Sequence, residues 1–252
     1  MLQEERFDYI FSELESGKAV KVSELAKKLK TSQSTIRRDI AELHEQKRLR
    51  RVFGGAVPIH MGVTTLDLDV ATRSVQNAAA KDQIGEYAAK LVIENDFVYI
   101  DAGTTTARLI AHLDPSLKDS VKFVTNGVRH AAALVERGFQ VYVPGGALKA
   151  VTEALVGVSA VQSIGRYNFS KCFLGVNGID SVNGFTTPDP DEAMVKEAVI
   201  RNSYMCYVLA DSTKFYNTSS ITFGNIKDAC IITEQLPDAS FRNHTIIKEV
   251  NL

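Results

Sequence analysis

The N-terminal part of the chain repeats its apolar residues at helical spacing. The spacing i, i+3, i+4 and i+7 predicts an amphipathic helix over residues 3–15, which Gly17 ends. The apolar positions of this helix are Phe7, Ile10, Phe11 and Leu14. Ser23 is a residue type that caps helices, and it predicts a second, short helix with an apolar face. The inward residues of the second helix are Leu25, Ala26 and Leu29.

A third helix and a small β-wing are predicted next. After the polar turn at residues 30–32, the apolar residues Ile36, Ile40 and Leu43 fall on one helix face. The segment RLRRVFGGAV then combines a basic strand with a Gly-Gly turn, which is typical of a wing. Residues 58–76 have no strong period and are interpreted as a linker.

From Asn77 onward, helical patterns alternate with short apolar runs. The helical patterns cover residues 77–94, 105–113, 127–137, 156–164 and 190–202. The apolar runs cover residues 97–101, 121–125, 140–143, 171–176 and 204–210. This alternation predicts an α/β domain with a mainly parallel sheet flanked by helices. The predicted organisation is therefore a winged helix-turn-helix at 1–57, a linker at 58–76 and a second domain at 77–252.

Composition is that of a globular protein. Of the 252 residues, 45% are hydrophobic and 23% are charged, and no stretch approaches the roughly 20 apolar residues of a membrane helix. The acidic N-terminus lacks an apolar signal core. Three cysteines, Cys172, Cys206 and Cys230, lie in apolar runs and predict buried free thiols. We therefore expect a cytoplasmic protein without membrane contact.

The net charge of −1 conceals a basic segment. Between Lys27 and Arg51, nine bases stand against three acids, an excess of six positive charges that leaves the remainder acidic. The bases are Lys27, Lys28, Lys30, Arg37, Arg38, Lys47, Arg48, Arg50 and Arg51, and the acids are Asp39, Glu42 and Glu45. A basic module on an acidic body favours a polyanionic partner, although charge alone equally fits a solvated basic helix face.

The third helix has a polar stripe opposite its apolar face. Ser34, Arg37, Arg38 and Ala41 lie on this stripe. Short hydroxyls and arginines are the groups that contact phosphates and guanine edges in a major groove, so this helix is the predicted recognition helix. The alternative without DNA binding is a helical protein-interaction domain. The order of three helices followed by a wing argues against it. The candidate contacts to double-stranded operator DNA are Ser34, Thr35, Arg37, Arg38, Arg50, Arg51, Gly54 and Gly55.

The strand FVYID runs directly into AGTTT and a helix. Free backbone N–H groups at this helix start, together with threonine hydroxyls, suit an anion, although threonines also cap helices without a ligand. Further polar loops follow other strands, and ligands of open α/β sheets bind where such loops collect. Glycines, carboxylates and lysines there suit a phosphorylated polyol. The candidate effector residues are Asp101, Gly103, Thr104, Thr105, Thr106, Asn126, Gly145, Gly146, Asn177, Gly178, Asp191, Glu192, Lys196 and Lys214.

Two segments carry a resemblance to a known family. STIRRDIAEL at 34–43 and RLRRVFGGA at 48–56 resemble the signature of the DeoR family of bacterial repressors, and the similarity continues through the whole chain. Lys47 and Phe53 depart from the glycine and histidine that are common in this family. The resemblance implies a repressor of a sugar uptake or catabolism operon.

The second half resembles the ribose-5-phosphate isomerase fold that this family uses for sensing. AGTTTARLI at 102–110 and ADSTK at 210–214 resemble the isomerase phosphate contacts, which implies that Gly103, Thr104, Thr105 and Lys214 hold a phosphate. AMVKE at 193–197 resembles the helix with the catalytic glutamate and matches it to Glu197. GVNGID departs from the aspartate-rich loop of the isomerases.

Two functions remain from this evidence. The first is a repressor that a phosphorylated sugar, such as fructose 1-phosphate, releases from its operator; the second is a sugar-phosphate isomerase with a DNA-binding appendage. The altered GVNGID loop favours the first, a non-enzyme. The five histidines lack metal-ligand spacing, so neither a metal nor a cofactor is expected. Paired half-sites predict a homo-dimer or homo-tetramer.

Overall fold

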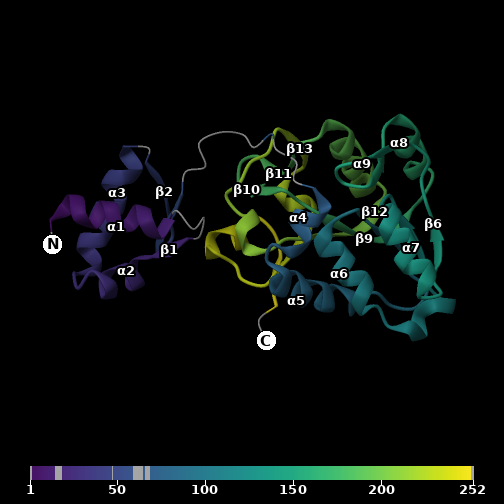
Figure 1. The fold of residues 1–252 in the computed structure, drawn as a ribbon, viewed down its shortest axis with the longest axis horizontal. Coiled ribbons are helices and arrows are strands. Elements are labelled where there is room, and N and C mark those ends of the chain that lie inside the picture. Colours follow the sequence, from purple (N-terminus) through teal and green to yellow (C-terminus); the bar gives the residue numbers. More distant parts are fainter. Residues whose placement is uncertain (1, 15–18, 47, 59–64, 66–68, 251–252) are drawn as a thin grey trace. The chain divides into compact units, whose positions relative to one another are not determined.

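The computed structural model describes residues 2–14, 19–46, 48–58, 65 and 69–250 (Figure 1). The chain divides into two compact units. The first comprises residues 1–62 with 237–243, and the second comprises 63–236 with 244–252. The predicted helix end at Gly17 lies outside the described residues.

The first unit is a three-helix bundle with a small antiparallel sheet. Its elements are α1 (Gln3–Leu14), β1 (Val20–Lys21), α2 (Val22–Lys28), α3 (Gln33–Glu45), β2 (Leu49–Val52) and β3 (Gly55–Pro58), with sheet order β1-β3-β2. The buried apolar core includes Ile10, Leu25, Ile36, Ile40 and Leu43. The three predicted helices are confirmed. The predicted cap at Ser23 is wrong, because β1 leads straight into α2 and places Lys21 at the cap position.

The second unit contains a seven-stranded sheet in which every pairing is parallel. Its order is β15-β14-β12-β9-β4-β5-β6. The strands are β4 (Phe97–Ile100), β5 (Lys122–Thr125), β6 (Gln140–Tyr142), β9 (Phe169–Gly175), β12 (Ser203–Leu209), β14 (Cys230–Thr233) and β15 (Ile247–Glu249). All five apolar runs form strands of this sheet, so the predicted parallel α/β fold is confirmed. The sequence pattern missed β14 and β15.

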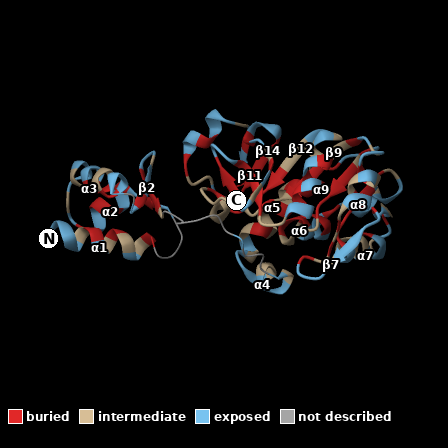
Figure 2. Cartoon of the chain, turned by 90° about the horizontal axis from the view of Figure 1, so that it is seen from above, coloured by how far each residue is buried: buried red, intermediate tan, exposed pale blue. Residues whose placement is uncertain are grey.

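The helices of the second unit are α4 (Val70–Val75), α5 (Ala78–Ala89), α6 (Thr104–His112), α7 (Val128–Glu136), α8 (Val158–Ile164) and α9 (Pro190–Arg201). Alternate residues of the strands face opposite sides of the sheet. Val98 and Ile100 pack with Ile84 of α5 and Leu109 of α6 in one buried cluster. The central strands of the sheet are largely buried while the outer helix surfaces are exposed, as Figure 2 shows.

Shorter elements complete the second unit. They are an antiparallel sheet of β10 (Gly178–Asp180), β11 (Gly184–Thr187) and β13 (Ile221–Gly224), and a hairpin of β7 (Ala147–Lys149) and β8 (Ala154–Val156). Three 3₁₀ turns of this unit cover Pro115–Asp119, Ser212–Lys214 and Ile226–Asp228, and a fourth, Ala239–Asn243, lies in the segment 237–243 that belongs to the first unit. Helix α4 lies inside the predicted linker, where the side chain of Asp69 caps it by accepting from Thr72 N at 2.8 Å.

The order of the strands creates a point where the chain changes direction in the sheet. From β4 the chain continues to β5 and β6 at one edge, and then returns to place β9 on the other side of β4. The loops after β4 and β9 are therefore neighbours, which is where open α/β sheets bind ligands. Among the described helices, none combines the length and apolarity needed to cross a bilayer. The three cysteines are free thiols; Cys172 is buried and the other two are half-buried.

Candidate functional site

The exposed face of α3 presents the predicted DNA-reading side chains. Ser34, Arg37 and Arg38 are exposed, while Thr35 and Ala41 are half-buried at the edges of the stripe. The Arg37 guanidinium donates from Nη2 to Gln33 Oε1 at 3.2 Å, one turn earlier. Two guanidiniums and a hydroxyl are thus available to a polyanion on one side of this helix.

An ion pair that the sequence did not reveal fixes the orientation of α3. Arg6 of α1 donates from Nε and Nη2 to the two carboxylate oxygens of Asp39, at 2.6 and 2.9 Å. The Asp39 side chain is only 2% exposed. The helix start is fixed as well, since Ser32 Oγ accepts from Thr35 N at 3.1 Å. The recognition helix is therefore held from both a neighbouring helix and its own cap.

The wing depends on its two glycines for different reasons. Gly54 has a φ of +80°, a conformation that residues with a Cβ adopt at a cost. Gly55 is buried where β3 pairs with β1, and a Cβ there would lie 1.9 Å from Val20 O. We therefore assign Gly55 to strand packing and not to DNA contact. Arg50 and Arg51 are exposed on β2; Lys47 lies outside the described residues.

In the second unit, the loop after β4 is held by groups beneath it. The Thr106 side chain lies 2.6 Å from Asp101 O and accepts from Gly103 N at 2.9 Å. His130 Nε2 lies 3.0 Å from Gly103 O, and burial lowers the pKa of this imidazole, so it is neutral at pH 7. Asn126 Oδ1 accepts from Ala102 N at 3.0 Å. Thr106, Asn126 and His130 thus shape the loop, and of these three His130 was not among the predicted effector residues.

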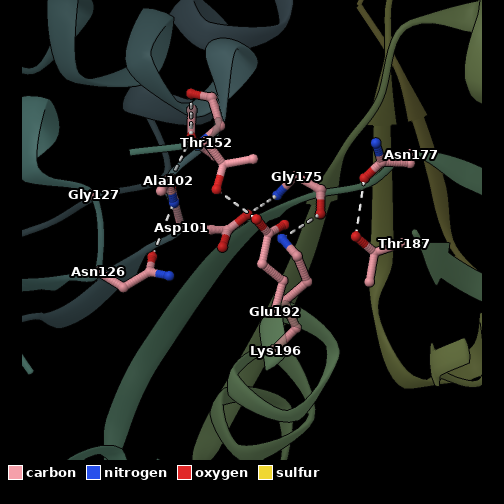
Figure 3. A network of polar contacts seen from close by, with 12 residues as sticks. Asp101, Ala102, Asn126, Gly127, Thr152, Gly175, Asn177, Thr187, Glu192 and Lys196 are labelled. Atoms are coloured by element: carbon pink, nitrogen blue, oxygen red, sulfur yellow. Dashed lines mark hydrogen bonds and ion pairs between the residues drawn. The ribbon is translucent and has the colours of Figure 1, made fainter. Parts of the chain in front are cut away.

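A buried ion pair joins this loop to the loop after β9. Lys196 of α9 donates to the Asp101 carboxylate and, at 3.0 Å, to Gly175 O. The same carboxylate accepts from Gly175 N at 3.0 Å. Figure 3 shows the side chains of Asp101, Lys196 and Glu192 pointing toward one another. The positive charge of Lys196 is therefore neutralised within the protein.

Two further groups close the network. Glu192 Oε1 accepts from Thr152 Oγ1 at 2.6 Å and from Lys149 Nζ at 3.1 Å. Asn177 Oδ1 accepts from Thr187 Oγ1 at 3.2 Å, as drawn in Figure 3. These bonds fix Glu192 and Asn177 as acceptors with set positions beside the loop.

A cleft opens above this network and is lined by cations. Its lining residues are Arg73, Lys81, Asp101, Ala102, Gly103, Thr104, Thr105, Gly175, Val176, Asn177, Glu192, Lys196 and Lys214. Among the described residues, Arg73, Lys81 and Lys214 have no ion-pair partner. Burial lowers the pKa of Lys81 to about 8; attraction by Asp211 opposes this shift, and repulsion from Lys214 and Arg73 adds to it. The cleft therefore holds an excess of positive charge, which the nearby Asp211 offsets in part.

Sequence reasoning missed two of these cations. Arg73 fell in the predicted linker, and its Nε and Nη2 atoms are buried without a hydrogen-bond partner in the described structure. Lys81 donates from Nζ to Arg73 O and is only 3% exposed. A signal for Lys81 was present, because it lies three residues before the buried Ile84 on the inner face of α5.

Several predicted effector residues do not line the cleft. Gly145 and Asp191 are exposed. Gly146 and Gly178 permit close packing, since a Cβ would lie 2.5 Å from Val156 O and 2.3 Å from Asn217 O, respectively. Thr106 and Asn126 support the loop from below. The residues that the structure brings together are Asp101, Gly103, Thr104, Thr105, Asn177, Glu192, Lys196 and Lys214.

Glu197 is not part of this cleft. It is exposed on α9 and accepts from Arg201 Nη2 at 3.0 Å. The match of Glu197 to a catalytic glutamate is therefore not supported by its position. Within the described residues, no group of three or more His, Cys, Asp or Glu side chains is arranged to hold a metal ion.

Comparisons with known proteins identify both domains of the chain. The DeoR-like helix-turn-helix domain matches residues 6–61, and the DeoR C terminal sensor domain matches residues 76–235. The chain is 41% identical over 253 residues to FruR of Bacillus subtilis, described as an uncharacterized HTH-type transcriptional regulator, covering 99% of each chain. It is 35% identical to the HTH-type transcriptional regulator GlpR of Haloferax volcanii, over 96% of this chain and 94% of that protein.

A solved structure is similar at a lower level. Ribose 5-phosphate isomerase A from Methanocaldococcus jannaschii is 14% identical, with a TM-score of 0.40 over 56% of this chain and 55% of the isomerase. The assignment of this chain therefore depends on the two domain matches and on relatives aligned over nearly its full length. The chain belongs to the DeoR family of helix-turn-helix transcriptional regulators.

Proposed function

We propose that this protein represses a sugar uptake or catabolism operon and that a phosphorylated sugar releases it from operator DNA. The observation that carries the proposal is the excess of positive charge around the start of α6. Three cations, Arg73, Lys81 and Lys214, surround a loop that offers backbone N–H groups and threonine hydroxyls. A phosphate dianion is the ligand that such a set binds best.

The other half of the cleft supports a hydroxylated ligand. Glu192 and Asn177 are held beside the cationic loop by internal hydrogen bonds. Fixed carboxylate and amide oxygens accept hydrogen bonds from sugar hydroxyls without losing further rotamer freedom. A ketohexose phosphate such as fructose 1-phosphate is one ligand of this class and is the first candidate for a test.

The DNA-binding half supports an operator with paired half-sites. The α3 stripe of Ser34, Arg37 and Arg38 would enter a major groove, while Arg50 and Arg51 of the wing would contact the backbone. One unit of this size reads one half-site, so a symmetric homo-dimer or homo-tetramer is part of the proposal. Relatives named as repressors, such as GlcR of Bacillus subtilis at 30% identity, support repression and not activation of transcription.

An isomerase is the weaker alternative. Isomerisation needs a base that reaches the substrate carbon. Glu197, the residue matched to that base, is exposed and bonded to Arg201, and Glu192 is held by Lys149 and Thr152. A turnover assay with pentose and hexose phosphates should therefore detect no product.

Operator titrations with and without ligand test the proposal. Fructose 1-phosphate and a panel of other sugar phosphates are compared with fructose and with inorganic phosphate. An effector present at about 100 times its dissociation constant adds about 2.7 kcal/mol to the stability of the protein, which a thermal shift detects. A protein that neither gains stability nor releases DNA with any sugar phosphate would refute the proposal.

The variant Lys214→Ala separates sensing from DNA binding. Loss of a charge-assisted contact of roughly 1.5–3 kcal/mol should weaken the effector about ten- to hundredfold. At effector levels that release the wild type, the variant should stay on the operator. Lys227→Ala is the matched control, since Lys227 is exposed on the turn Ile226–Asp228, and it should respond like the wild type. Release of Lys214→Ala at wild-type effector levels would remove this lysine from the site.

A further inference from the structure

Two of the three cysteines lie directly opposite each other on neighbouring strands. Cys172 of β9 and Cys206 of β12 are partners in the parallel register, and the two strands run side by side in the sheet (Figure 1). Register partners carry their side chains on the same face of a sheet. Cys230 is the register partner of Tyr207, one residue after Cys206, so its thiol lies on the opposite face. The sheet therefore brings two thiols together and separates them from the third.

The spacing of the two strands is close to the reach of a disulfide. Neighbouring strands lie about 4.8 Å apart, and disulfides join Cα atoms that are about 4.4–6.8 Å apart. Because side chains stand roughly perpendicular to a sheet, the two Cβ atoms are also about 4.8 Å apart. A relaxed disulfide holds its Cβ atoms about 3.8 Å apart, so closing the bond needs a shift of about 1 Å. A bond formed under such strain is easily reduced again.

The two thiols differ in burial and in acidity. The Cys172 side chain is fully buried, whereas Cys206 is half-buried and follows the exposed Tyr204 and Met205 on β12. A hydrogen bond from the Cys172 thiol lowers the pKa of Cys206, while burial raises the pKa of Cys172 well above its usual value. Cys206 itself donates to Ile200 O at 3.7 Å. Cys206 is therefore the thiol that solvent reaches and that more readily becomes a thiolate, which is the reactive form.

We propose that Cys206 and Cys172 form a dithiol that a peroxide oxidises to a reversible disulfide between β9 and β12. In the first step the Cys206 thiolate attacks one peroxide oxygen and the O–O bond breaks. The departing hydroxide takes up the proton that Cys206 released and leaves as water, so Cys206 becomes a sulfenic acid. In the second step the Cys172 sulfur attacks the Cys206 sulfur, the S–O bond breaks, and the hydroxide that leaves takes the Cys172 proton as a second water. The two thiols thus lose two electrons to the peroxide, and a small thiol restores them by exchange.

The proposed bond joins two strands that lead toward the cationic cleft. Gly175 ends β9 three residues after Cys172, and Asp211 follows the end of β12. Among the described residues, those that line the cleft do not include either thiol. The dithiol is therefore a second site, and its chemistry does not depend on which ligand the cleft binds.

Peptide mapping of the full-length protein tests the pair, because trypsin separates the three cysteines. Cleavage after lysine and arginine places Cys172 in residues 172–196, Cys206 in 202–214 and Cys230 in 228–242. The native protein is treated with one equivalent of hydrogen peroxide, alkylated in denaturant and digested without reductant. We expect two of the three free thiols to disappear and the first two peptides to be linked, in a chain that a non-reducing gel shows as a monomer. Dithiothreitol should restore all three thiols.

Three variants separate the two steps. Cys206→Ser should form no disulfide and should leave Cys172 reduced, because the buried thiol is not reached by itself. Cys172→Ala should stop after the first step, with a sulfenic acid on Cys206 that dimedone labels. Cys230→Ser is the matched control, since Cys230 is half-buried like Cys206 but lies on the other face, and it should form the disulfide as the wild type does.

A linked peptide that contains Cys230, or three free thiols after peroxide treatment, would overturn the pairing. An equal yield of the same linked peptide from protein oxidised in urea would show that the fold does not direct the reaction. Oxidation of Cys172 in Cys206→Ser at the wild-type rate would overturn Cys206 as the first target. Should Cys172→Ala not fold, the comparison of Cys206→Ser with Cys230→Ser decides the same point.

Discussion

The affinity of the effector should fall as the pH rises through the titration of Lys81. Burial of the ammonium lowers its pKa from 10.5 to about 8, although the neighbouring Asp211 carboxylate favours the charged form. A phosphate dianion in the cleft would hold the proton on Lys81 and raise that pKa. Binding is therefore coupled to proton uptake above pH 8.

The size of the effect follows from the pKa. In the ligand-free protein, Lys81 is about one-tenth neutral at pH 7 and about ten-elevenths neutral at pH 9. If the bound state keeps the proton throughout this range, effector affinity falls about tenfold between pH 7 and pH 9. The second pKa of a phosphate monoester is about 6, so the ligand stays a dianion. The free energy of unfolding of the ligand-free protein should instead rise with pH between pH 8 and 10.5. In this range the unfolded chain, whose lysine has an ordinary pKa, binds more protons than the folded protein.

Calorimetry in buffers of different ionisation enthalpy measures the coupled proton directly. At pH 8 the wild type should take up about half a proton per ligand bound. Lys81→Arg keeps its charge throughout this range and should show neither the proton uptake nor the tenfold loss of affinity. If Lys81→Arg also loses affinity about tenfold between pH 7 and pH 9, another group is responsible for the titration. If the affinity of the wild type does not change over this range, the buried lysine keeps an ordinary pKa.

Three predictions concern the DNA-binding unit. Arg38→Ala should cost roughly 1–3 kcal/mol on operator DNA and less on random DNA in anisotropy titrations, and an unchanged operator affinity would mean that α3 is not the reading helix. Arg51→Ala should weaken binding to both DNAs and flatten the slope of log K against log salt by about 0.9, whereas a loss on operator alone would indicate base reading. Gly55→Ala should lower the thermal stability of the first unit, by about 1–3 kcal/mol, because its Cβ would overlap Val20 O; an unchanged melting temperature would contradict the close strand pairing.

Long periodic segments were predictable from sequence, and short ones were not. The apolar runs that became β4 and β9 form strands in the centre of the sheet, where both faces are buried and the pattern is strongest. Strand β15 has only three residues and lies at the sheet edge, and α4 has six residues with none buried. Such elements leave no periodic signal, because their place is decided by contacts with distant parts of the chain.

The candidate site likewise contains residues that local sequence patterns identify and residues that only the folded structure brings into place. The loop from Gly103 to Thr105 and the position of Lys214 could be found because each follows a recognisable strand. Arg73 could not, because its contribution depends on the left-handed corner at Asn77 that returns α4 to the cleft. No local pattern in the sequence specifies that corner.

The case of Glu197 shows why residue type alone does not assign a role on a helix. Adjacent residues of an α-helix point about 100° apart, so two neighbours in the middle of a helix can face different surroundings. On α9, Lys196 is buried and paired with Asp101, whereas Glu197 faces outward to Arg201. The helix thus gives the site a lysine whose charge is already neutralised. The charge that remains for a ligand comes from Arg73, Lys81 and Lys214, and these belong to segments whose positions depend on one another through Asn77 and Asp211. An anion bound by these three cations would therefore contact the same groups that hold α4 in place.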